Sequence, residues 1–205
     1  MKELIVISAP TLLKNEATLI NALFDEGLDL FHLRKPEISL NDLLRFVDDI
    51  DYRYYERIVF PASTFMDYLP VSDISKKIHF FEYLRNETDR LVFDKLQQEG
   101  RILSTSIHEI ETYKNLPASF DYTFFSPVFD SISKQGYKAM GKEQLNIANI
   151  KRDIKLIALG GINRFNCLKA LEYGFDGIAL LGAIWQDDSP VKAFRDIRNV
   201  VLRGL

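Results

Sequence analysis

Hydroxyls and a cation gather in one short segment that follows an apolar run. Residues 126–138 read SPVFDSISKQGYK and come after FDYTFF, and Ser131, Ser133, Lys134 and Gly136 lie within this segment. A turn needs residues that accept turn geometry, but it has no need for two hydroxyls and an ammonium group together. Hydroxyl donors and a compact positive charge suit the oxygens of a phosphate. The segment therefore predicts an anion-binding loop, with a solvated surface loop as the alternative.

Glycines offer a second set of contacts to an anion. Gly160, Gly161 and Ile162 follow the apolar run KLIAL, and Gly182 follows GIALL. Backbone N–H groups in such turns can approach an anion closely, and the dipole of a helix that begins there favours negative charge. Asn163 stands where the N-cap of that helix is expected. We expect a phosphate-binding pair of turns, and turns without a ligand are the alternative.

An arginine and the histidines complete the set of candidate residues. Arg34 ends the run LDLFHLR, so its planar fork of donors would point toward a phosphate or a carboxylate, although a structural ion pair is also open. His32 and His108 lie near the ends of apolar runs and could transfer protons near neutral pH. Hydrogen-bonded scaffolding is the commoner role for such histidines. His79, inside an apolar run, is expected to be structural.

Eight short apolar runs must position these residues. Each is rich in Ile, Leu, Val and Phe, which is typical of strands buried on both faces. The runs lie at 4–8, 28–34, 57–61, 77–80, 101–106, 122–126, 155–161 and 177–182. Strand and helix alternate, so we predict one compact (β/α)8 barrel over 1–205, with an open doubly wound sheet as the alternative. In such barrels the site lies where the strands end, and the candidate residues stand there.

Amphipathic stretches of helical period lie between most of the runs. The clearest are 15–27, 163–174 and 190–204, and 61–75 and 81–90 are the weakest. The first two are expected to bury Ala17, Ile20, Leu23 and Phe24, and Phe165, Leu168, Ala170 and Leu171, respectively. The third begins with Pro190, as a first-turn proline would.

Composition excludes several classes of protein. The chain has 205 residues, 47% of them hydrophobic, and a net charge of −3 without a basic stripe, so nucleic acid and membrane surfaces are not expected partners. Its longest apolar run, IALLGAIW, is far too short to span a bilayer, and the apolar run near the start is too short for a signal peptide. Cys167 is the only cysteine, so neither an intrachain disulfide nor a cysteine cluster can form. We expect a cytoplasmic enzyme or binding protein.

The ordered motifs resemble those of the thiamine phosphate synthase/TenI family. The resemblance covers most of the chain and is strongest over 104–184. SIH at 106–108 resembles the family's Ser-x-His, and DYTFFSPVFDSISK resembles its Asp-Tyr, Pro-Val-Phe and Thr-x-Thr-Lys pattern. ALGGIN and NCLKALEYGFDGIALLGAI resemble the last two strand ends, and LR at 33–34 matches part of Gln-Leu-Arg-x-Lys.

The resemblance implies a barrel of thiamine biosynthesis. Family synthases join hydroxymethylpyrimidine diphosphate to thiazole phosphate with Mg2+ and release diphosphate, without an organic cofactor, and they are often homodimers. The resemblance assigns phosphate contacts to Arg34, Ser131, Ser133 and Lys134, a part of the diphosphate site to Ser106, and backbone contacts with the thiazole phosphate to Gly161 and Gly182.

Departures from the family pattern concern the metal. The Asn-Asp pair expected after the third strand is replaced by FPAS, and His-x-Gly-Gln-x-Asp is replaced by HFFEYL, with Leu84 in the place of the acid. Mg2+ bound to a diphosphate normally has at least one protein carboxylate as ligand. Glu82 and Glu37 remain as weak candidates, and His32 and Pro36 replace the family glutamine and lysine.

Three functions stay open at this point. The first is synthase activity with a substitute carboxylate or weak metal binding. The second is a metal-free thiazole tautomerase, whose acid/base histidine would fall at Pro127, so that His32 or His108 would have to replace it. The third is a catalytically silent protein that binds thiazole phosphate.

Overall fold

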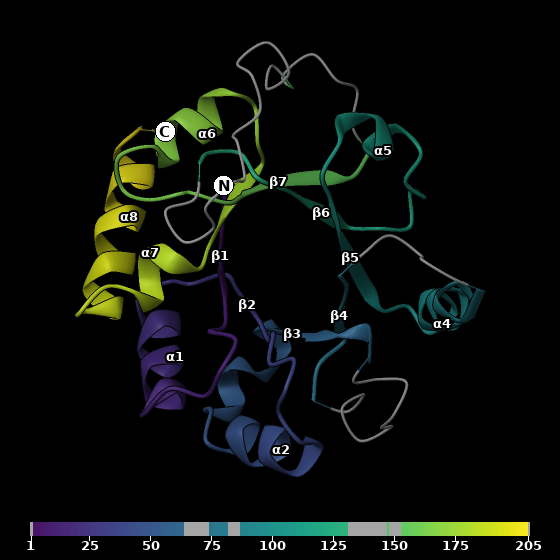
Figure 1. The fold of residues 1–205 in the computed structure, drawn as a ribbon, viewed down its shortest axis with the longest axis horizontal. Helices are drawn as coiled ribbons and strands as arrows, with labels where there is room; N and C mark the ends of the chain where they lie inside the picture. The colour runs from purple at the N-terminus through teal and green to yellow at the C-terminus, as the bar shows by residue number, and fades with distance from the viewer. Residues whose placement is uncertain (1, 64–73, 82–86, 131–146, 148–152, 205) are drawn as a thin grey trace.

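Parallel strands close into a complete barrel in the computed structural model, which describes residues 2–63, 74–81, 87–130, 147 and 153–204 (Figure 1). The eight strands follow one another around the barrel in chain order, and β1 pairs with both β2 and β8. Their bounds are β1 Glu3–Ile7, β2 Leu30–His32, β3 Ile58–Pro61, β4 Lys77–Phe80, β5 Ile102–Ile107, β6 Tyr122–Phe125, β7 Lys155–Leu159 and β8 Gly177–Leu180. Each lies within one of the apolar runs or overlaps it. The predicted (β/α)8 barrel is confirmed, and the open sheet is excluded.

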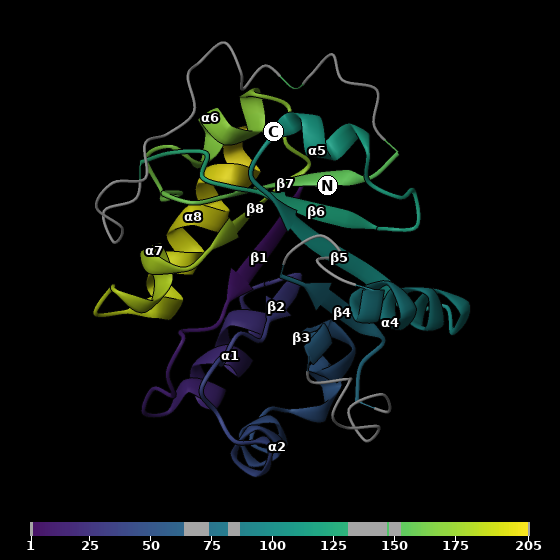
Figure 2. The ribbon, with the colours of Figure 1, turned by 45° about the vertical axis from the view of Figure 1, so that its right-hand side comes forward.

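Helices surround the barrel on its outside, as both views show (Figures 1 and 2). They are α1 Glu16–Asp25, α2 Leu40–Asp48, the 3-10 helix η1 Tyr52–Arg57, α4 Glu87–Gln98, α5 Ile110–Lys114, α6 Cys167–Glu172, α7 Gly182–Trp185 and α8 Pro190–Gly204. No helix in the described part of the chain is long and apolar enough to cross a membrane.

Side chains alternate between two buried layers, because successive residues of a strand point to opposite faces. The outer layer packs the barrel against the helices and includes Val6, Leu33 and Ile78. The interior of the barrel has an apolar cluster built mainly on β1, β6, β7 and β8, which comprises Ile5, Ile7, Tyr122, Phe124, Ile157 and Ala179. Buried polar residues on β2, β4 and β5 face this cluster, namely His32, His79 and Ser104. The buried polar groups of the interior thus lie on one side, opposite the apolar cluster.

The helix at 15–27 has the expected buried face. Ile20, Leu23 and Phe24 of α1 are buried, and Ala17 packs against the same core. Pro190 begins α8 as predicted. The weakest predicted helices, 61–75 and 81–90, lie largely outside the described residues.

The prediction for Phe165 is wrong. This side chain is 82% exposed, with the guanidinium of Arg164 over its ring at 4.4 Å. The helix begins only at Cys167, because Asn163 and Asn166 close a turn before it: Asn163 N donates to Asn166 Oδ1 at 2.8 Å, and Phe165 N donates to Asn163 Oδ1 at 2.9 Å. Phe165 therefore belongs to this turn, and Cys167 is buried in its place. Asn166, not Asn163, is the N-cap residue of α6.

Candidate functional site

The carboxyl ends of the strands form one end of the barrel, which we call the mouth. Among the described residues there, Arg34 follows β2, Phe81 follows β4, and Ser106 lies near the end of β5. The glycine pair 160–161 follows β7, and Gly182 follows β8. The fold therefore brings several of the candidate residues to the mouth, although they are far apart in the sequence.

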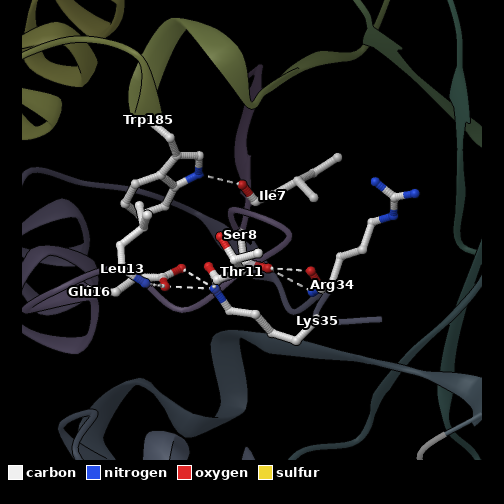
Figure 3. Close-up of polar contacts among 8 residues, drawn as sticks. All are labelled: Ile7, Ser8, Thr11, Leu13, Glu16, Arg34, Lys35 and Trp185. Atoms are coloured by element: carbon white, nitrogen blue, oxygen red, sulfur yellow. Dashed lines mark hydrogen bonds and ion pairs between the residues drawn. The ribbon is translucent and has the colours of Figure 1, made fainter. Parts of the chain in front are cut away.

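Arg34 is fixed by its backbone and exposed at its tip. Its backbone N donates to the Ser8 hydroxyl at 2.8 Å, and that hydroxyl donates to the Arg34 carbonyl oxygen at 3.0 Å (Figure 3). Ser8 is buried, whereas Arg34 is exposed and its guanidinium carbon lies 5.6 Å from the centre of the Phe81 ring. No carboxylate of the described residues forms an ion pair with this guanidinium. Arg34 is thus available to bind an anion at the mouth.

Lys35 points away from the mouth, because alternation along the chain turns it toward the helices. Its Nζ donates to both Glu16 carboxylate oxygens, at 2.6 and 2.8 Å, and to the Thr11 carbonyl oxygen at 2.7 Å (Figure 3). The side chains of Lys35 and Glu16 are 1% and 0% exposed. Burial lowers the pKa of Lys35, and its hydrogen bond with Glu16 opposes this effect. The pair holds the β1–α1 loop against the end of β2. It thereby supports the two hydrogen bonds between Ser8 and the backbone of Arg34.

His32 lies in the barrel interior, below the mouth. It is buried, and its Nε2 is 2.6 Å from the hydroxyl of Tyr122 on the far side of the interior. Burial lowers its pKa well below the ordinary value, and the nearby His79 adds to this effect. This placement weighs against His32 as an acid or base that acts on a ligand at the mouth.

His79 is also buried, and both of its ring nitrogens have hydroxyl partners. Nδ1 is 2.9 Å from Ser104 Oγ, and Nε2 is 3.1 Å from Ser106 Oγ. Burial lowers the pKa of His79 to about 3, and the positive charge of Arg34 contributes. Ser106 is only partly buried, so it connects this interior group with the mouth.

His108 lies at the rim of the mouth rather than inside the barrel. It is exposed, and its Nδ1 donates to the carbonyl oxygen of Ser126 at 2.8 Å. Ser126 directly precedes Pro127, where the resemblance places the family's acid/base histidine. His108 is therefore the histidine that a ligand could reach, through Nε2.

The turn after β7 needs glycine for a reason that the sequence does not show. Gly160 and Gly161 have φ angles of 95° and 66°, in the left-handed region. A Cβ on Gly161 would lie 2.5 Å from the carbonyl oxygen of Asp130 and 2.7 Å from that of Phe129. Phe129 N also donates to the Gly160 carbonyl oxygen at 3.1 Å. Close packing against residues 127–130 thus requires Gly161, whether or not the turn binds a phosphate.

The other candidates for phosphate binding have mixed placements. The side chain of Ile162 is buried in the outer core, so only its backbone could contact a ligand. Gly182 is the first residue of α7, and a Cβ there would meet only the Gln186 side chain, at 3.4 Å. Ser131, Ser133 and Lys134 lie outside the described residues, so the anion-binding loop stays a prediction. Its starting point, Asp130, lies beside Gly161.

The described residues do not fit a site for Mg2+. β3 ends at Pro61, which Ala62 and Ser63 follow, so no carboxylate stands there. Glu37 is exposed in the turn after β2, and Glu82 lies outside the described part of the chain. Within that part, no group of three or more His, Cys, Asp or Glu residues could hold a metal ion.

Some residues that build the mouth gave only a weak signal in the sequence. Ser8 is the polar residue at the end of the first apolar run, but its contact with Arg34 spans 26 positions. Ser104 and Tyr122 lie inside apolar runs, and their contacts with His79 and His32 join residues that are distant in the sequence. Strand alternation could have placed Lys35 on the outside of the barrel, since His32 and Arg34 point inward.

The fold and the mouth together define a (β/α)8 barrel with polar groups at its strand ends. Residues 85–184 match the family model described as thiamine monophosphate synthase. The thiamine-phosphate synthase of Streptococcus suis (strain 98HAH33) is 35% identical over 97 residues, which is 46% of this chain and 42% of that protein. That of Chlorobium luteolum is 34% identical over 104 residues, 50% of this chain and 49% of that protein. The alignments thus span about half the length of these curated relatives.

Solved structures are similar over nearly the whole chain. Thiamine phosphate pyrophosphorylase from Bacteroides thetaiotaomicron is 28% identical, with a TM-score of 0.74, and 98% of each chain is covered. The enzyme from Pyrococcus furiosus has a TM-score of 0.79 at 20% identity, covering 99% of this chain and 96% of that chain, which shows the fold alone. Together these comparisons show sequence similarity to thiamine-phosphate synthases over about half of the chain and a shared fold over nearly all of it.

Proposed function

We propose that this protein couples a pyrimidine diphosphate to thiazole phosphate and releases diphosphate, the activity for which its relatives are named. The observation that carries the proposal is Arg34, an exposed guanidinium at the mouth that is held through its backbone by Ser8. In this reaction the bond between the pyrimidine methylene carbon and the diphosphate oxygen breaks, and the oxygen keeps the electron pair. The thiazole nitrogen then forms the new bond to carbon.

Arg34 would act on the charge that develops on the leaving diphosphate. A fixed guanidinium costs little reorganisation during the reaction and can form two parallel hydrogen bonds with phosphate oxygens. The glycine turn 160–161 and the loop that begins after Asp130 would bind the phosphate group of thiazole phosphate. The described residues do not fit a site for Mg2+, so the stabilisation of the leaving diphosphate is assigned to Arg34.

A silent phosphate-binding protein is the second candidate. It is favoured by the end of β3, where Pro61, Ala62 and Ser63 provide no metal ligand of the kind that a diphosphate-bound Mg2+ requires. A tautomerase would need His108, because His32 is buried and bonded to Tyr122. Its activity would be independent of metal.

A coupling assay separates these functions. Purified protein at high concentration is mixed with hydroxymethylpyrimidine diphosphate and thiazole phosphate, in Mg2+ or in chelator, and thiamine phosphate is detected by fluorescence. We expect product from the wild type, with at least a tenfold lower rate in Arg34→Ala. Arg45→Ala is the matched control, because Arg45 is 81% exposed on α2 and lies outside the mouth.

Other outcomes would reject the coupling function. No product from folded protein that binds thiazole phosphate by calorimetry would support the silent binder. Isomerisation of a carboxythiazole phosphate in chelator, lost in His108→Asn, would support a tautomerase. Equal rates for Arg34→Ala and the wild type would remove Arg34 from the mechanism.

A further inference from the structure

Three side chains of β4 and β5 form a hydrogen-bonded line from the barrel interior to the mouth. His79 lies between two serines of the neighbouring strand, with Ser104 at its Nδ1 and Ser106 at its Nε2. The strand register places His79 directly beside Ser104. Ser104 is buried, and Ser106 is partly exposed. The line therefore has an inner end and an outer end.

The number of protons in this line is fixed. His79 is buried, and the charge of Arg34 opposes a second positive charge, so the ring is neutral at neutral pH. A neutral imidazole has one N–H donor and one nitrogen acceptor. Each serine hydroxyl has a single hydrogen to donate. One ring nitrogen must therefore donate to its serine, and the other must accept from its serine.

Ser104 decides which nitrogen donates. Its hydroxyl donates to the Ile78 carbonyl oxygen at 3.3 Å, and a carbonyl oxygen can only accept. Because the only hydroxyl hydrogen of Ser104 is donated to Ile78, Ser104 can interact with His79 Nδ1 only as an acceptor of the Nδ1–H hydrogen. Nε2 is left as the acceptor, and Ser106 donates its hydrogen to it. The outer end of the line consequently presents only oxygen lone pairs to the mouth.

We infer that His79 is a positioning residue that makes the Ser106 hydroxyl a hydrogen-bond acceptor toward the mouth, so that this part of the site binds an N–H group of a ligand rather than a phosphate oxygen. An unprotonated phosphate oxygen at this position would face another acceptor without a hydrogen between them. The inference differs from the diphosphate role that the family resemblance implies for Ser106. It rests on the proposed function only in placing the ligand at the mouth.

The tautomer of His79 is measured by 15N NMR of the imidazole nitrogens in the intact chain at neutral pH. The chain has three histidines, and the signals of His79 are assigned with His79→Gln and His108→Asn. We expect a protonated Nδ1 and an unprotonated Nε2. In Ser104→Ala, which removes the partner of Nδ1, a mixture of both tautomers is expected. A protonated Nε2 in the wild type, alone or together with a protonated Nδ1, would overturn the inference.

Binding of small probes tests the consequence for the ligand. Ser106→Ala should change the affinity for inorganic phosphate less than twofold, whereas Arg34→Ala should weaken it at least tenfold. In NMR titrations, Ser106→Ala should weaken the binding of 4-aminopyrimidine at least threefold. The binding of 4-methylpyrimidine, which has the same shape without the N–H donor, should be unchanged. A loss of phosphate affinity in Ser106→Ala as large as in Arg34→Ala would refute the acceptor role.

These readouts need no turnover. If the coupling assay gives no product but the tautomer and the probe selectivity are as expected, only the proposed reaction is rejected. Product formation with a protonated Nε2 would reject this inference alone.

Discussion

The buried ion pair between Lys35 and Glu16 gives the sharpest prediction for stability. Both side chains are almost fully buried, and Lys35 Nζ is bonded to Glu16 and to the Thr11 carbonyl oxygen. Lys35→Met leaves the Glu16 carboxylate buried without its counter-charge, which typically costs about 3–5 kcal/mol. A domain of this kind has a free energy of unfolding of about 5–15 kcal/mol, so the variant would lose a large part of its stability.

Removing both charges should cost less than removing one. In the double variant Lys35→Met, Glu16→Leu no buried charge remains. The main loss is then the acceptor of Leu13 N, which donates to Glu16 Oε2 at 3.0 Å, and one such buried group costs about 1–3 kcal/mol. The double variant should therefore be more stable than Lys35→Met alone, with a coupling free energy of about 2 kcal/mol or more.

Urea unfolding at neutral pH measures these free energies. Lys192→Met is the matched control, because Lys192 and Asp196 form an exposed ion pair on α8 whose side chains are 68% and 36% exposed. The loss of this exposed ion pair should change the free energy of unfolding by less than about 1 kcal/mol. A cost below about 1 kcal/mol for Lys35→Met, or additive costs in the double variant, would refute the reasoning.

Further predictions concern the mouth and its support. Gly161→Ala should destabilise the fold by about 2–4 kcal/mol in urea unfolding, because of its positive φ and the contact with the Asp130 carbonyl, and an unchanged midpoint would contradict this packing. Ser8→Ala should lower the free energy of unfolding by about 1–3 kcal/mol and weaken phosphate binding, because the backbone N–H and carbonyl of Arg34 both lose their hydrogen-bond partner. Unchanged phosphate affinity in calorimetry would show that these two hydrogen bonds are not needed for binding. The pKa of His79 is lowered from 6.5 to about 3, so the unfolded chain binds more protons and stability present above pH 6.5 is lost as the pH falls toward 3. His79→Gln should flatten this pH dependence by up to about 1.4 kcal/mol per pH unit, and an unchanged slope would count against a buried neutral imidazole.

The barrel could be predicted because its strands are buried on both faces. That burial produces compact runs of Ile, Leu, Val and Phe at even spacing, and each run became one strand. The placement of candidate residues at the strand ends follows from the same regularity. The error at Phe165 has a local cause, since the amides of Asn163 and Asn166 satisfy backbone groups in a turn and delay the helix.

The supports of the site could not be predicted, because they depend on contacts between distant segments. Nothing near residue 34 in the sequence indicates that Ser8 holds its backbone, and nothing near residue 161 indicates that Asp130 packs against it. The roles of the buried histidines also depend on partners from other strands, such as Tyr122 for His32. The sequence thus indicates which chemistry a residue can perform, but it does not indicate whether a ligand can reach that residue.

The two-sided interior of the barrel has a consequence for how this chain can diverge. Residues 85–184, which match the family model, include β5 to β8, and these strands supply much of the apolar interior. His32, Arg34 and His79 precede that segment and lie toward the polar side. Substitutions at these three residues would therefore change the polar side of the barrel and leave the apolar cluster of β1 and β6 to β8 in place.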